Sequence, residues 1–79
     1  MPMAMRLSDI CITRRLSSSI PCKKELDSCM EYWNEHHKQD RYIIINDDFV
    51  LIDGYIMYLV LKKNHVEYAD VEILSVRVD

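Results

Sequence analysis

The 79-residue chain contains a single glycine, so its backbone has very few positions where a left-handed turn comes without strain. Average usage of about 7% would give about five glycines in a chain of this length. Gly54 lies between the apolar run Phe49–Ile52 and the helix-prone run Tyr55–Lys63. The pattern predicts a strand, a tight turn at Gly54 and a helix, with Asp53 as the N-cap of that helix and Asn64 as its left-handed stop.

The sequence also lacks an excess of positive charge and any long hydrophobic run. Ten basic and thirteen acidic residues give a formal net charge of −3. A protein that binds nucleic acid electrostatically is usually basic, so we expect direct DNA binding to be weak. The longest apolar stretches, Tyr42–Ile45 and Tyr55–Leu61, are far shorter than the roughly 18 residues of a membrane span. We expect one cytoplasmic domain over residues 1–79, without membrane contact and with residues 1–5 disordered.

Cysteine chemistry is limited as well. The three cysteines are Cys11, Cys22 and Cys29. Their number is odd and their spacing matches no zinc-binding signature, so we expect reduced thiols packed as small apolar groups. Asp47, Asp48 and Asp53 could be read as a magnesium site, but a turn and a helix cap explain them without a metal. The sequence therefore predicts no metal ion and no cofactor.

The first half of the chain contains one clear helical pattern. Apolar side chains recur at the spacing i, i+3, i+4 and i+7, at Leu26, Cys29, Met30 and Trp33. Pro21 suits the start of this helix, and His36 and His37 suit its end, where cations favour the helix dipole. Upstream, we expect a short strand within Leu7–Thr13 and a polar connector at Arg14–Ser19.

Three further strands are expected in the second half. Tyr42–Ile45 and Phe49–Ile52 are separated by a short turn, which predicts an antiparallel hairpin. The segment Val71–Val78 alternates but slips phase at Leu74, which indicates a strand with a bulge. Together these elements predict an α+β domain in which two main helices pack on a mixed sheet with a central hairpin.

The stretch from Tyr42 to Lys62 resembles the core of the ParB/sulfiredoxin superfamily, also called the ParB-like nuclease domain. The family pattern is an apolar strand, a turn, an isoleucine-aspartate-glycine motif, a helix and a returning strand. Its counterparts here are Ile43–Ile45, Leu51–Gly54, Tyr55–Leu61 and Ala69–Ile73. The resemblance covers residues 6–76, with Leu7–Ile10 looking like the opening strand, and it implies a ParB-like fold.

The resemblance implies an anion site at the turn, formed by Asp53, Gly54, Tyr55 and Ile56. A glycine at the start of a helix lets backbone amides approach a phosphate group. The family places an arginine three positions after the glycine, where this chain has Met57. Sulfiredoxins place a nucleophilic cysteine directly after the glycine, where this chain has Tyr55. We therefore expect weak nucleotide binding and no catalytic residue.

The function expected from these features is that of a non-enzymatic binding or regulatory module, associated with DNA-partition, phage or mobile-element proteins. Tyr55 and Tyr58 are three residues apart on one helix stripe and, if both are exposed, form a surface for a protein partner or a homodimer. The alternative is an active CTP- or ATP-binding or nuclease-type domain that uses the Gly54 turn. A third reading places a DNA-reading domain on another chain.

Overall fold

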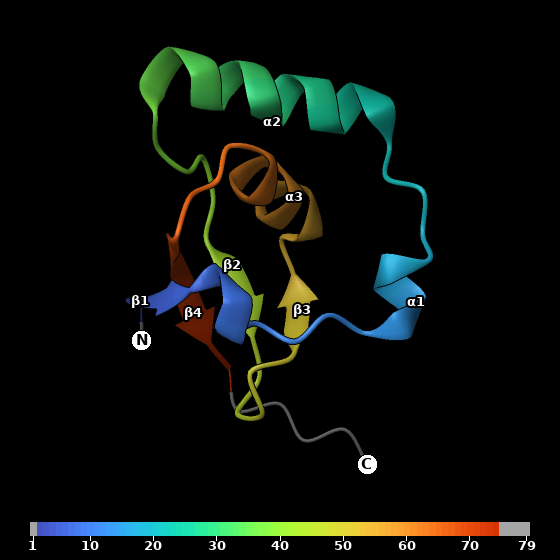
Figure 1. The fold of residues 1–79 in the computed structure, drawn as a ribbon, viewed down its shortest axis with the longest axis vertical. Coiled ribbons are helices and arrows are strands. Elements are labelled where there is room, and N and C mark those ends of the chain that lie inside the picture. The colour runs from blue at the N-terminus through green and yellow to red at the C-terminus, as the bar shows by residue number, and fades with distance from the viewer. Residues whose placement is uncertain (1, 75–79) are drawn as a thin grey trace.

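The computed structural model describes residues 2–74, which fold as a small α+β domain (Figure 1). In chain order the elements are β1 (Pro2–Arg6), the 3-10 helix η1 (Leu7–Asp9), α1 (Arg14–Ser17), α2 (Lys23–His36), β2 (Ile43–Ile45), β3 (Leu51–Asp53), α3 (Tyr55–Lys63) and β4 (Tyr68–Ile73). The four strands form one mixed sheet in the order β1-β4-β2-β3. Figure 1 shows α3 lying between the strands and α2. The predicted fold class is confirmed.

The sheet combines a hairpin with a parallel pair. β2 and β3 pair antiparallel, as predicted, with a register shift between Ile44 and Ile45. β2 and β4 pair parallel, because the chain reverses direction at the hairpin and again in the connection through α3 between β3 and β4. β4 begins at Tyr68, three residues before the predicted start at Val71, and ends at Ile73. Leu74, where a bulge was predicted, follows the end of the strand, and the predicted continuation over residues 75–78 lies outside the described residues.

The N-terminal segment differs from the prediction. Residues 1–5 were expected to be disordered, whereas Pro2–Arg6 forms β1 and pairs antiparallel with β4. Within Leu7–Thr13, where a strand was expected, Leu7–Asp9 is a 3-10 helix and Cys11 forms an isolated parallel β-bridge with Val50. The expected connector Arg14–Ser19 contains the short helix α1, whose first turn is capped by the side chain of Thr13. β1 was missed because its apolar residues are methionine and alanine rather than β-branched residues.

The core is formed mainly by the inner side of the sheet and by α3. The buried side chains are Met5, Leu7, Ile10, Cys29, Ile43, Ile45, Leu51, Met57, Tyr58, Val60, Leu61, Ala69 and Val71. Leu26, Met30 and Trp33 of α2 are partly buried and pack against this core, as the helical pattern predicted. None of the helices within residues 2–74 is long and apolar enough to cross a bilayer.

The helix α3 covers the predicted residues, but its N-cap and the left-handed residue that follows it each lie one residue later than predicted. Its N-cap is Gly54 rather than Asp53. The left-handed residue after the helix is His65, with φ of 57°, whereas Asn64 has φ of −92°. Asn64 nevertheless ends the helix, because its side-chain amide donates to the Val60 carbonyl at 2.8 Å.

Candidate functional site

The turn between β3 and α3 has the geometry that the lone glycine predicts. Gly54 has φ of 89°, in the left-handed region that side chains disfavour. A Cβ atom at this position would lie 3.1 Å from Ile43 Cα and 3.2 Å from the Tyr42 carbonyl oxygen. The beginning of β2 therefore packs directly against the turn. The Gly54 carbonyl accepts from the Tyr58 amide at 2.9 Å and starts the helix.

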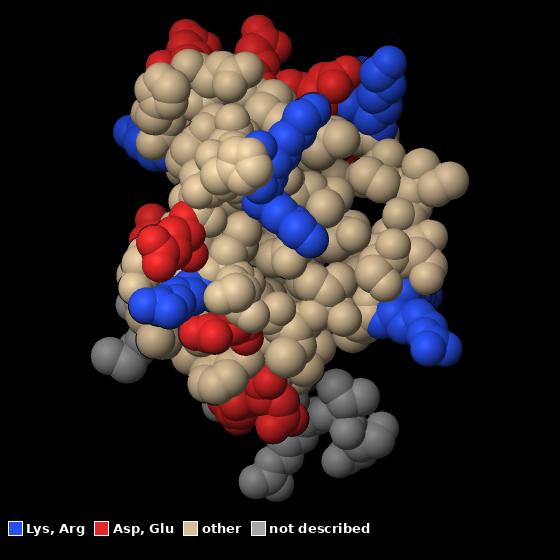
Figure 2. Space-filling model, in the orientation of Figure 1, with Lys and Arg blue, Asp and Glu red and all other residues tan. Residues whose placement is uncertain are grey.

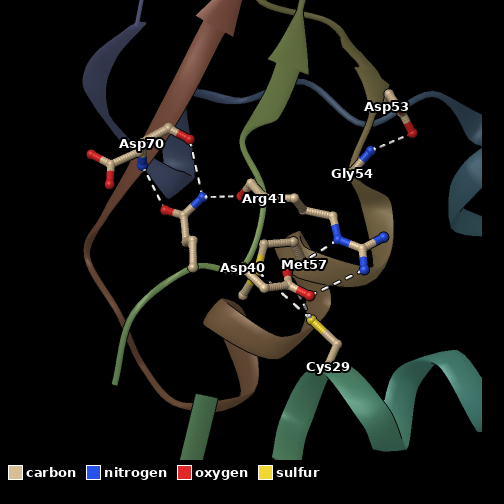
Figure 3. A network of polar contacts seen from close by, with 8 residues as sticks. Cys29, Asp40, Arg41, Asp53, Gly54, Met57 and Asp70 are labelled. Carbon is tan, nitrogen blue, oxygen red and sulfur yellow. Dashed lines mark hydrogen bonds and ion pairs between the residues drawn. The ribbon is translucent and has the colours of Figure 1, made fainter. Parts of the chain in front are cut away.

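The carboxylate of Asp53 accepts a hydrogen bond from the Gly54 amide, the first backbone amide of this turn. Its Oδ1 atom accepts from the Gly54 amide at 2.8 Å (Figure 3). The predicted role of Asp53 as the helix N-cap is therefore wrong, because its side chain satisfies the turn itself. The amides of Tyr55 and Ile56 follow in the first helical turn, where no intrahelical acceptor exists. The predicted anion-site residues are adjacent, but one of their amides already binds an internal carboxylate.

Met57, at the position where the resemblance places an arginine, points into the core. It is 1% exposed, and its Sδ atom lies 3.7 Å from Cys29 Sγ of α2. A side chain at this position serves the packing of α3 against α2. Position 57 therefore differs from the family pattern in two ways. It carries no positive charge, and its side chain is buried, so it cannot reach a ligand at the turn.

A cation that the sequence analysis missed lies beside the turn. Arg41 precedes the Tyr42–Ile43 backbone that packs against Gly54. Its Nε and Nη2 atoms donate to the two carboxylate oxygens of Asp40, both at 3.1 Å. Figure 3 shows the guanidinium extending toward the first turn of α3. Spacing along the chain does not predict this position of Arg41, because β2 and the Gly54 turn are brought together by the pairing of β2 with β3.

The Arg41–Asp40 pair is an internally neutralised ion pair. The hydrogen bond from Arg41 to Asp40 raises the pKa of the guanidinium, which stays charged. The Arg41 side chain is 58% exposed, and that of Asp40 is 21% exposed. An incoming anion would therefore meet a cation that already has a carboxylate partner. A pocket of about 210 Å³ opens here, lined by Gln39, Asp40, Arg41, Tyr42 and Asp70.

Cys29 lies next to this ion pair, but its surroundings do not activate the thiol. Its Sγ atom lies 3.9 Å from Asp40 Oδ1, and the residue is 3% exposed. Burial, and next the negative charge of Asp40, raise the pKa of the thiol. The thiol is therefore protonated at neutral pH and is a poor nucleophile. Cys11 and Cys22 are exposed free thiols.

Tyr55 and Tyr58 stack on each other, with ring centroids 6.1 Å apart and planes inclined by 14°. Tyr58 is only 9% exposed and belongs to the core, and Lys62 Nζ lies 6.0 Å from its ring centroid. The predicted aromatic surface required both rings to be exposed. Because Tyr58 is used inside the domain, Tyr55 supplies most of the surface that this pair could offer to a partner.

The remaining charges do not form a continuous basic surface on the face shown in Figure 2. Acidic side chains gather there over α2 and again at the opposite end of the molecule, with basic side chains between them. Such interruption disfavours contact with a run of phosphates. Within residues 2–74, no three histidine, cysteine or carboxylate side chains are grouped to hold a metal ion.

The arrangement of strands and helices around the Gly54 turn is shared with solved structures. One crystal form of the Pnob8-like ParB-N domain matches 98% of this chain with a TM-score of 0.81 and 14% sequence identity. A second structure, of the pNOB8-like ParB N-domain, matches 98% with a TM-score of 0.76 and 18% identity. The chain has a ParB-like fold. No family model and no curated protein matches the sequence.

The ParB-like fold accounts for the whole described domain but only for part of the neighbouring proteins. This chain spans 30% and 28% of the lengths of the two solved chains. At these sequence identities the similarity is one of backbone arrangement. The resemblance of the Ile52–Gly54 motif is thus confirmed at the level of fold, and the chemistry of the turn has to be inferred from this chain's own residues.

Proposed function

We propose that this chain is a non-enzymatic binding module of ParB-like fold that acts through contact with another protein. The observation that supports this function best is that the Gly54 turn lacks a free first amide and a nearby family arginine. Its first amide binds the Asp53 carboxylate at 2.8 Å, and Met57 is buried where the resemblance expects an arginine. The solved neighbours are ParB N-domains within longer chains, which supports a partition-related assembly whose DNA-reading part lies elsewhere.

The charges at the turn explain why we expect nucleotide binding to be weak. A phosphate group placed near Gly54 would lie close to the carboxylate of Asp53, and like charges at short range repel. To bind the phosphate, Arg41 would have to give up its two hydrogen bonds to Asp40. Phosphate binding would replace the Asp40 carboxylate by a phosphate at the same Arg41 guanidinium, so the net gain in binding free energy is small.

The experiment that tests the proposal is calorimetric titration of the chain with CTP and with ATP, each with Mg²⁺. No binding at millimolar nucleotide is expected. The double variant Asp40→Asn, Asp53→Asn removes both carboxylates, and it should bind more tightly than the parent chain. A matched variant, Asp27→Asn and Glu31→Gln on α2, makes the same change in net charge away from the turn and should leave binding unchanged.

The second candidate function is a nucleotide-binding domain in which Arg41 replaces the family arginine. The position of Arg41 beside the turn and its 58% side-chain exposure favour this alternative. It predicts that the unmodified chain binds CTP or ATP at micromolar concentration and that Arg41→Ala abolishes binding, whereas Arg15→Ala does not. That result would overturn the proposed function. Cleavage of plasmid DNA by the same sample with Mg²⁺ would do so as well.

A further inference from the structure

The outward side of the sheet carries exposed apolar side chains. Along β4, the buried residues Ala69 and Val71 alternate with Tyr68, Asp70 and Glu72, which face outward. Tyr68 is 51% exposed. Ile44, between buried Ile43 and Ile45, faces the same side from β2. We name this outward surface of β4, β2 and β3 the open sheet face.

The pairing register brings further residues of the neighbouring strands to this surface. Ile44 is paired both with Glu72 of β4 and with Asp53 of β3. Because Ile43 is paired with Val71, Tyr42 lies beside Asp70. Side chains that are paired across neighbouring strands lie within contact distance of each other. The open sheet face is therefore a set of apolar groups interleaved with carboxylates.

Two more apolar side chains enlarge this surface. Tyr42 is 50% exposed and also lines the pocket beside Arg41, together with Asp70. Ile52, the extra residue at the register shift between β2 and β3, is 44% exposed. Large apolar side chains gathered on one side of a small domain are typical of a surface that contacts another protein.

The carboxylates of the open sheet face are not neutralised within the domain. Asp70 and Glu72 form no ion pair with any residue from 2 to 74. The nearest cation on β1, Arg6, instead donates from Nε to the Tyr68 hydroxyl at 3.2 Å and lies 5.8 Å from that ring. Arg41 is held by Asp40. Arg6 keeps its positive charge, because the Tyr68 hydroxyl is neutral. The three carboxylates of Asp53, Asp70 and Glu72 outnumber this one cation, so the net charge that the surface offers to a partner is negative.

We propose that the open sheet face binds a basic, amphipathic segment of a partner protein, with lysine or arginine side chains at Asp70 and Glu72 and apolar side chains on Tyr42, Ile44 and Tyr68. The proposal rests on the proposed function as a protein-binding module and names the chemistry of its partner. The partner's cations gain Coulomb energy, and its apolar groups cover the exposed tyrosine and isoleucine surface.

Two other occupants fit the charges less well. Single-stranded nucleic acid stacks on exposed aromatic rings, but its phosphates would meet Asp70 and Glu72. A second copy of this chain, related by a two-fold axis, would bring the same carboxylates against each other, because such an interface is self-complementary. The net charge of −3 opposes both arrangements.

The test is an NMR titration of the ¹⁵N-labelled chain with a synthetic peptide of alternating lysine and leucine. Shifts are expected at the amides of β4, β2 and β3 and not along α2. The variant Asp70→Lys, Glu72→Lys should weaken binding by about tenfold or more, which corresponds to about 1.4 kcal/mol. The control variant Glu31→Lys, Glu35→Lys makes the same charge change on the exposed side of α2 and should weaken it by less than about threefold.

The aromatic part of the surface has its own variant. Tyr42→Ala should weaken binding of the lysine-leucine peptide without any change of charge, whereas Tyr32→Ala on α2 should not. Melting curves of each variant, followed by circular dichroism, show that the domain remains folded. A peptide of alternating glutamate and leucine should not bind.

Four results would overturn the inference: no binding of the lysine-leucine peptide, an equal loss from the β4 and α2 charge variants, tighter binding of oligothymidylate to the same amides, or a concentration-dependent dimer that the β4 variant abolishes. The proposed function fails separately, through nucleotide binding in calorimetry. A chain that binds neither nucleotide nor the basic peptide would retain the proposed function and lose this inference.

Discussion

The two main helices use their surfaces in opposite ways. α3 has nine residues, of which Met57, Tyr58, Val60 and Leu61 are buried, whereas α2 has fourteen and buries only Cys29. The reason is their position, since α3 lies between the sheet and α2 (Figure 1). A helix enclosed on two sides has few positions from which a side chain can reach a ligand. The polar side chains near the Gly54 turn therefore come from outside α3, from Asp53 at the end of β3 and from Arg41 in the segment that leads into β2.

The largest loss of stability is expected when a buried apolar residue of α3 is replaced by a charged one. Met57→Arg places a guanidinium at a position that is 1% exposed, and an unpaired buried charge costs about 4 kcal/mol of unfolding free energy or more. Urea unfolding followed by circular dichroism measures this loss. Met57→Leu keeps the volume and should cost less than about 1.5 kcal/mol. A stable Met57→Arg variant that binds CTP would show that α3 can turn this position outward.

A smaller loss is expected at the start of α3. Gly54→Val should destabilise the domain by about 1–3 kcal/mol, because valine disfavours a φ of 89° and its Cβ would crowd the backbone of Ile43. The opposite substitution at the end of α2, His37→Gly, relieves a φ of 51° and should leave the unfolding free energy within about 1 kcal/mol of the parent. Equal effects of the two variants would show that the Gly54 turn has no special strain.

The connection that leaves α2 should be next in importance. The Gln39 side chain accepts from the Asp70 amide at 2.6 Å and donates to the Asp70 carbonyl at 3.1 Å and the Arg41 carbonyl at 3.0 Å. It thereby continues the parallel pairing of β4 beyond the start of β2. Gln39→Ala should cost about 1–2 kcal/mol and speed hydrogen exchange at the Asp70 amide. Asn34→Ala, at an exposed position of α2, should do neither.

The smallest effect concerns the one buried residue of α2. The pKa of the Cys29 thiol is raised in the folded state, so the unfolded chain loses its proton first as pH rises. Stability is therefore complete below the ordinary thiol pKa of about 9 and falls as pH rises through the folded value. Cys29→Ala should flatten the decline in unfolding free energy above pH 9, measured by urea titration, whereas exposed Cys22→Ala should leave it unchanged. Equal slopes in both variants would contradict burial of the thiol.

Local signals in the sequence were enough to predict the two main helices, α2 and α3, and the hairpin, but not η1 or the short helix α1. α3 covers Tyr55–Lys63 as predicted, because Gly54 limits where it can start. The role of Asp53 could not be predicted, since an aspartate beside a glycine can accept from either the turn or the helix. The side-by-side position of Arg41 and Gly54 depends on the pairing of β2 with β3, which no local pattern reveals.

The same limit applies to the first strand and to the site. Met3 and Met5 do not mark a strand until β4 is present to pair with them. The anion site that the resemblance implies at residues 53–56 stays a prediction, whereas the burial of Met57 and Tyr58 could be seen only once α3 is packed in the core. The exposure of the residues at this site, and the charges around it, could therefore be determined only from the tertiary structure.

The pairing of β1 with β4 constrains when this protein can fold during its synthesis. Met3 is paired with Val71, so the sheet joins residues from nearly opposite ends of the chain. A ribosome adds residues at about 5–20 per second, and β4 emerges only after the rest of the domain. Until then, β1 has no strand to pair with and its methionines stay in water. We expect the sheet to close only after β4 has emerged from the ribosome, so β1 is the first strand to be made and among the last to be paired.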